Sequence, residues 1–86
     1  MENKEIIKYP LSTEKSIRLM EAENKLIFVV DKKATKAEIK KEIEVLFKAK
    51  VAGVKTLISN KGEKRAYVKF ALDTPAIDIA TNLGLI

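Results

Sequence analysis

The chain has 86 residues, of which 47% are hydrophobic, and it contains no Cys, His or Trp. This length suits one small domain, and the hydrophobic content is too high for a disordered segment. Without Cys, disulfides, thiolate nucleophiles and Cys-based zinc sites are excluded, and without His the commonest general base and metal ligand is missing. Catalysis by Lys, Tyr or carboxylate side chains stays open but lacks its usual partners, so we expect a protein that is not an enzyme and holds no metal or cofactor.

The net charge of +5 is concentrated in the middle of the chain. Residues 31–65 contain eleven basic and five acidic side chains, whereas residues 1–30 contain five of each. A localised positive surplus is typical of nucleic-acid binding, and it also fits a solvated, lysine-rich helix face. The longest purely apolar run, Leu26 to Val30, is far shorter than the roughly 20 residues of a membrane-spanning helix, and the N-terminal residues lack an apolar signal core. We expect a cytoplasmic protein.

The first half of the chain predicts a strand, a helix and a second strand. Residues 5–11 form the first strand, and the helix runs from a cap at Ser12 or Thr13 to about Glu23. Residues 25–31 contain a continuous apolar run, which is typical of a strand buried on both faces and central in its sheet. Because both faces of that strand are apolar, we expect the first or the last helix to cover one of them.

The second half predicts a long helix, a hairpin and a last helix. Thr35 and Glu38 stand three residues apart, as in a capping box, and start a helix over 35–48. After the hairpin, Thr74 caps a last helix that has Pro75 at its first position. The order β-α-β-α-β-β-α indicates one α+β domain over the whole chain, with a four-stranded antiparallel sheet. Helical spacing places the following residues toward the core: Ile17, Met20, Ile39, Ile43, Leu46, Phe47, Ile77, Ala80 and Leu83.

The predicted hairpin is apolar on one face and basic on the other. Its strands, 51–59 and 64–72, flank a turn at 60–63 in which Asn and Gly tolerate positive φ. Because side chains alternate along a strand, Ala66, Val68 and Phe70 point one way and need cover from helix 35–48. The opposite face carries Lys55, Arg65, Tyr67 and Lys69.

Two clusters favour nucleic acid as the ligand. The first is the basic hairpin face with Lys61 and Lys64 at its turn, where Tyr67 offers a stacking surface beside phosphate-binding cations. The second leads from the central strand into the main helix and comprises Lys32, Lys33, Lys36 and Lys40. Each cluster also has a plainer interpretation, as a solvated sheet face or as a solubilising helix face. The alternative function is a protein-interaction adaptor without RNA, which would need a contiguous exposed apolar patch.

Five strings occur in a characteristic order and spacing: PLSTEKS at 10–16, NKLIFVV at 24–30, ATKAEIKKEIEVLF at 34–47, VAGVKTL at 51–57 and KRAYVKF at 64–70. Together they resemble the L23 family of large-subunit ribosomal proteins, over Ile7 to Leu83. The resemblance implies a structural protein that binds ribosomal RNA beside the polypeptide exit tunnel, with other ribosomal proteins as neighbours. The hairpin turn is too short for the tunnel-reaching extension of bacterial members, and the long basic N-terminal extension of eukaryotic members does not precede the match. An archaeal form is therefore expected.

The resemblance and the two clusters together define the candidate sites. The candidate RNA contacts are Lys15, Lys32, Lys33, Lys36, Lys40, Lys55, Lys61, Lys64, Arg65, Tyr67 and Lys69. In the resembled family, residues around the TEK string lie on the solvent side of the ribosome and help to dock factors that meet the emerging chain, such as the signal recognition particle. The matching carboxylate is Glu14, whose simpler role is to stabilise its helix start by about 0.3–1 kcal/mol.

Overall fold

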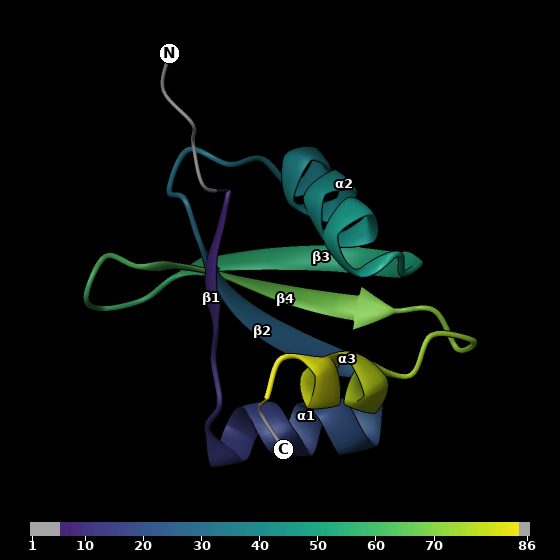
Figure 1. Cartoon of the computed structure of the whole chain (residues 1–86). Helices are drawn as coiled ribbons and strands as arrows, with labels where there is room; N and C mark the ends of the chain where they lie inside the picture. The colour runs from purple at the N-terminus through teal and green to yellow at the C-terminus, as the bar shows by residue number, and fades with distance from the viewer. Residues whose placement is uncertain (1–5, 85–86) are drawn as a thin grey trace.

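The computed structural model describes residues 6–84, and its elements follow the predicted order β-α-β-α-β-β-α (Figure 1). The elements are β1 (Ile7–Pro10), α1 (Glu14–Glu23), β2 (Lys25–Val30), α2 (Lys36–Phe47), β3 (Val51–Ile58), β4 (Lys64–Phe70) and α3 (Ala76–Asn82). The predicted α+β class is confirmed. Residue 5, the expected start of the first strand, lies outside the described residues. No helix within residues 6–84 has the length and apolar character needed to cross a membrane.

The four strands form one antiparallel sheet in the order β1-β2-β4-β3. Strand β2 is therefore an inner strand, as predicted, and all its residues after Lys25 are buried. In the pairing of β2 with β4, Ile27 lies opposite Tyr67 and Phe28 lies opposite Ala66. Because side chains alternate along each strand, this register determines which residues share a face of the sheet.

One face of the sheet packs against all three helices. The core cluster joins strand residues Leu26, Phe28, Val30, Ala66, Val68 and Phe70 to helix residues Met20, Ile39, Ile43, Ala76, Ile79 and Ala80. Helix α2 packs beside the β3–β4 hairpin (Figure 1), and the ring centroids of Phe28 and Phe47 are 6.0 Å apart. The predicted cover of the hairpin by α2 is confirmed. Each large apolar side chain buried here contributes about 1.5–3 kcal/mol.

The helix starts agree with the capping signals except in α3. The Thr13 hydroxyl accepts a hydrogen bond from the backbone N–H of Ser16, and the Thr35 hydroxyl accepts one from Glu38, both at 3.1 Å. In α3 the N-cap is Pro75, so the predicted Thr74 cap is wrong. Instead, the Oδ1 of Asn24, from outside the helix, accepts the first N–H of α3, that of Ala76, at 2.7 Å.

Three of the predicted core residues are exposed. Ile17, Leu46 and Ile77 are 37%, 54% and 48% exposed, respectively. Each of these residues lies at the edge of the apolar stripe of its own helix. Each helix contacts the rest of the protein through the middle of its stripe only, so the edge remains exposed. In α1 the buried positions are Ser16 and Met20, which are four residues apart.

The opposite face of β2 is flanked by side chains of the neighbouring strands. Ile27 and Val29 are each only 3% exposed, yet they stand outside the core cluster. Tyr67 lies opposite Ile27 in the strand register, and Val29 lies between Tyr9 and Arg65. The expectation that a helix covers this face is wrong, because Met20 of α1 and the buried residues of α3 belong to the core cluster on the other side. We call this second side the open face; its polar residues are Lys25, Lys55, Arg65, Tyr67 and Lys69.

Candidate nucleic-acid interface

Three lysines from three adjacent strands gather on the open face. Lys25 of β2 lies opposite Lys69 of β4, and Lys55 of β3 lies opposite Tyr67. Together with Gly53, these residues line a depression of about 300 Å³. Like charges on neighbouring strands repel one another, so their grouping costs stability and creates a positive potential toward solvent. An anionic partner relieves that repulsion.

Glu23 partly neutralises this cluster from the end of α1. Its Oε1 lies 2.9 Å from the Nζ of Lys25. The hydrogen bond and the charge of Lys25 lower the pKa of the Glu23 carboxyl, and the charges of Lys69 and Lys55 lower it further. Within residues 6–84, Lys55 and Lys69 form no ion pair themselves. Both are exposed, so they are the cations of the cluster that are available to a ligand.

Tyr67 and Lys15, two predicted RNA contacts from distant parts of the chain, come together at this face. The Nζ of Lys15 lies 6.0 Å from the centroid of the Tyr67 ring. This is the limit at which a cation is attracted to an aromatic face. Helix α1 thus adds a positive charge beside the one aromatic ring of β4 that faces away from the core.

Arg65 stands at the other end of the open face and is held by a carboxylate. Its Nη2 lies 3.5 Å from Oε1 of Glu63, whose Oε2 accepts a 2.7 Å hydrogen bond from the Tyr9 hydroxyl. The Tyr9 bond lowers the pKa of Glu63, with a smaller contribution from Arg65, and the same bond raises the pKa of Tyr9. The Arg65 Nε is buried and has no hydrogen-bond partner among the described residues. Glu63 therefore restrains Arg65 and offsets part of its charge.

A second basic group surrounds the end of the β3–β4 hairpin. Lys8, Lys32, Lys61 and Lys64 line a groove of about 220 Å³ there. The Nζ of Lys64 donates to the carbonyls of Ala34 and Lys32 at 2.7 and 3.4 Å. Lys64 thus ties the loop before α2 to the hairpin, and only one of its three N–H donors remains for a ligand.

The remaining predicted contacts lie with the helices. Lys36 and Lys40 are exposed on α2, whose buried side faces the core. Lys33 is exposed in the preceding loop. The helix layer and the open face are on opposite sides of the sheet, so one flat RNA surface cannot contact both Lys40 and Lys55. The predicted residues therefore separate into an open-face group, a hairpin-end group and a helix group.

Comparisons with known proteins agree with the resemblance found in the sequence. Residues 5–78 match the family model described as ribosomal protein L23. The chain is 44% identical over 81 residues to the large ribosomal subunit protein uL23 of the archaeon Methanococcus aeolicus, and the match covers 94% of each chain. This chain belongs to the ribosomal protein L23 family. The predicted family, its archaeal form and its non-enzymatic class are thereby confirmed.

Two residues of the L23-family open face were missed by sequence reasoning. Lys25 shares one side of β2 with Ile27 and Val29, because the three follow one another at intervals of two residues, so that side could have been found from the strand pattern. Its place beside Lys69 depends on the pairing of β2 with β4. Gly53 lies opposite Lys69, and a Cβ added to it would meet no atom within 4 Å. Nothing in the local sequence around Gly53 indicates that empty space.

Glu14, the candidate docking residue of this L23-family chain, lies exposed in the first turn of α1. The Thr13–Ser16 capping box already satisfies backbone donors at this helix end. The Glu14 carboxylate is therefore accessible to a partner, and its structural role is confined to the favourable position near the helix dipole.

Proposed function

We propose that this L23-family protein is a structural component of the large ribosomal subunit that binds its RNA through the open face. The observation that carries the proposal is the gathering of Lys25, Lys55, Lys69 and Tyr67 on a sheet face that no helix covers. Lysine cations bind phosphates, and an aromatic ring beside them stacks with bases. The uL23 relative is named as a large-subunit protein, which supports the same assignment.

The hairpin-end group extends this RNA surface along one edge of the molecule. Lys8, Lys32 and Lys61 line the same groove as Glu63, and Glu63 contacts Arg65 of the open face. Phosphates that follow one RNA strand are regularly spaced, so a row of cations binds it without reading sequence. The adaptor alternative has less support: Leu57 is 59% exposed on the open face, but it stands opposite Arg65 rather than in an apolar patch.

The test compares two variants with the same change in charge. Lys55→Gln/Lys69→Gln removes two cations from the open face, and Lys36→Gln/Lys40→Gln removes two from α2. Binding to deproteinised large-subunit RNA is measured as a function of salt. Because each phosphate contact contributes a slope of about 0.7–0.9 in log affinity against log salt, we expect the open-face variant to lose about 1.4–1.8 from the slope. The α2 variant should lose less than half of that.

Equal losses in the two variants would show that total charge alone drives binding and would overturn the assignment to the open face. A larger loss in the α2 variant would move the interface to the helix layer. Circular dichroism and urea unfolding of both variants confirm that the fold is retained, which is expected because all four lysines are exposed.

We infer further that the helix-start surface at Glu14 faces away from the RNA beside the exit tunnel and docks the signal recognition particle. The inference is supported by the exposure of Glu14 and by the capping box that leaves its carboxylate unused. Glu14→Lys should leave ribosome incorporation intact and weaken recruitment of the particle, chiefly through the association rate. Glu21→Lys, at another exposed position of α1, is the matched control. Unaltered recruitment by Glu14→Lys ribosomes would confine Glu14 to the helix start.

A further inference from the structure

We propose that the depression on the open face holds one unpaired nucleotide, with its base stacked on Tyr67 and its phosphates bound by Lys55 and Lys69. The inference rests on the proposed RNA binding and deepens it, because it names the RNA feature that this surface selects. The partner is an RNA whose bulge or loop presents a free base, rather than a continuous duplex.

Gly53 leaves an open space on this face of the sheet. Gly53 lies on β3 opposite Lys69, and the strand register shifts between Val51 and Gly53. A Cβ built at Gly53 would meet no atom within 4 Å, so no neighbouring side chain fills the gap. The resulting depression of about 300 Å³ lies at the lower end of the roughly 300–1,000 Å³ of ligand sites. It is large enough for a planar ring and open enough for a nucleotide to enter.

Positive charges surround that space. Lys25, Lys55 and Lys69 all line the depression, each from a different strand. Glu23 holds Lys25 at 2.9 Å, whereas Lys55 and Lys69 are exposed. A nucleotide that enters the depression brings its own phosphates to the rim, where these two cations can neutralise them.

Tyr67 forms part of the wall of the depression. Its cross-strand neighbours are Ile27 on one side and Lys55 on the other, so the ring is confined between two strands. Lys15 adds a cation 6.0 Å from the ring centroid. An unpaired base exposes its flat face to such a ring, whereas a paired base in A-form RNA is already stacked within the helix. The same surface therefore favours an RNA with a free base.

The test uses two RNA probes and the tyrosine fluorescence of the protein. One probe is a fully paired RNA hairpin, and the other is the same hairpin with a single bulged adenosine. The chain has two Tyr and no Trp, so in a Tyr9→Phe background Tyr67 is the only tyrosine that reports. We expect the bulged hairpin to bind roughly fivefold or more tightly than the paired one and to quench Tyr67 fluorescence, since base–aromatic stacking is worth at least that factor.

Two substitutions separate stacking from charge. Tyr67→Leu should weaken binding of the bulged hairpin by roughly tenfold and of the paired hairpin by less than about twofold. Gly53→Val should give the same loss with Tyr67 still present, because its side chain fills the depression. The φ of Gly53 lies outside the left-handed region, so valine is tolerated there by the backbone. Thermal unfolding of each variant checks that the fold is retained.

The outcomes distinguish this inference from the proposed function. If neither hairpin binds, the proposed RNA binding itself fails. If both hairpins bind equally and Tyr67→Leu affects them equally, RNA binding stands and the unpaired-nucleotide site is overturned. Selective loss of the bulged probe in both variants, with quenching in the parent protein, supports the site.

Discussion

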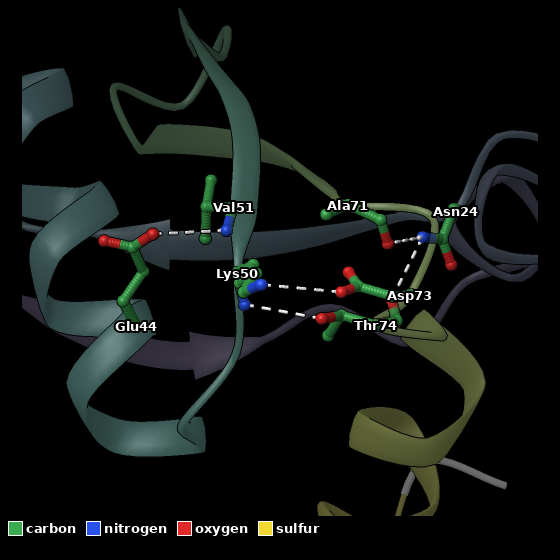
Figure 2. A network of polar contacts seen from close by, with 7 residues as sticks. All are labelled: Asn24, Glu44, Lys50, Val51, Ala71, Asp73 and Thr74. Atoms are coloured by element: carbon green, nitrogen blue, oxygen red, sulfur yellow. Dashed lines mark hydrogen bonds and ion pairs between the residues drawn. The ribbon is translucent and has the colours of Figure 1, made fainter.

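Asn24 joins the end of α1 to the start of α3 through a single side chain. Its Nδ2 donates to the carbonyls of Ala71 and Thr74, each at 3.1 Å (Figure 2), and also lies 3.2 Å from the carbonyl oxygen of Phe70. Its Oδ1 accepts from the backbone N–H of Ala76 at 2.7 Å, which is the first N–H of α3. Its own φ of 57° is left-handed, a conformation that Asn tolerates better than most residues. One residue therefore ends α1, caps α3 and holds the β4–α3 connection.

Replacing Asn24 separates the side-chain bonds from the backbone conformation. Asn24→Gly keeps the left-handed backbone and should cost about 1–3 kcal/mol, because it leaves part-buried carbonyls and an N–H without partners. Asn24→Ala should cost roughly 1 kcal/mol more, because it adds the strain of a left-handed Cβ. Urea unfolding measures both. A Gly variant as stable as the parent protein would show that water replaces the side-chain bonds without loss.

The hydrogen bond between Tyr9 and Glu63 should make stability depend on pH in both the acidic and the alkaline range. The bond lowers the pKa of Glu63 below 4.5, so its contribution is present above pH 4.5 and is lost as the pH falls through the lowered pKa. The same bond raises the pKa of Tyr9 above 10.0, so that contribution is present below pH 10.0 and is lost as the pH rises through the raised pKa.

Tyr9→Phe is the variant that tests this pH dependence. Urea midpoints across the acidic and alkaline ranges should vary less steeply in Tyr9→Phe than in the parent protein, at both ends. Glu23→Gln is the control: because Lys25 lowers the pKa of Glu23, removing that carboxyl should change the acidic range only. Identical pH profiles of Tyr9→Phe and the parent protein would show that the bond does not contribute to stability in solution.

At the scale of the element, α2 shows how a helix is positioned by its ends and by a narrow buried stripe. Its capping box is complete, since Glu38 Oε1 also accepts from the N–H of Thr35 at 2.9 Å. Ile39 and Ile43 are both 0% exposed, whereas Leu46 points to solvent. The fully buried residues of α2 are thus four positions apart. The side of α2 that faces the sheet is therefore narrower than the stripe formed by all the apolar residues of the helix.

Alanine substitutions along α2 should reproduce this stripe. Ile43→Ala should cost about 2–5 kcal/mol, because it leaves a cavity in the core. Leu46→Ala, on the same helix and also apolar, should change stability by less than about 0.5 kcal/mol. Phe47→Ala should fall between them, because the ring packs on Phe28 but is only partly buried. A Leu46 variant as unstable as the Ile43 variant would show that Leu46 is covered in solution.

At the scale of the whole molecule, the fold places its helices on one side of the sheet and groups Lys25, Lys55 and Lys69 on the other. All three helices contribute to one core cluster, so none of them packs on the opposite face. The cationic cluster there is incompletely neutralised, because within residues 6–84 Glu23 pairs with Lys25 and not with Lys55 or Lys69. The electrostatic repulsion between the grouped lysines is therefore present in the free protein, and a bound anion would reduce it.

Removing the Glu23 carboxylate should strengthen RNA binding by freeing Lys25. If Lys25 then contacts a phosphate, the slope of log affinity against log salt should steepen by about 0.7–0.9. Glu42→Gln on α2 makes the same change in net charge on the helix side and should leave the slope nearly unchanged. Equal effects of the two substitutions would mean that RNA responds to net charge and not to the Lys25 site.

The sequence by itself determined the elements and the character of each strand. The alternating pattern of residues 64–70 predicted that Ala66 and Val68 are buried and that Tyr67 and Lys69 are accessible. This prediction succeeded because the alternation of side chains depends only on the local geometry of an extended chain. Capping residues predicted the starts of α1 and α2 for the same reason, since a cap hydrogen bond joins residues three apart in the chain. The ordered strings identified the family, and the charge count indicated an anionic partner.

The tertiary structure alone decided which of these features meet. The antiparallel pairing of β2 with β4 brings Lys25 beside Lys69, and it is set by burial across segments about forty residues apart, which no local pattern encodes. The same packing separates Lys36 and Lys40 from the open face and exposes Leu46, because the width of a buried stripe depends on what lies against it. Asn24 caps a helix that begins far along the chain for the same physical reason: its partners are neighbours in space and not in sequence.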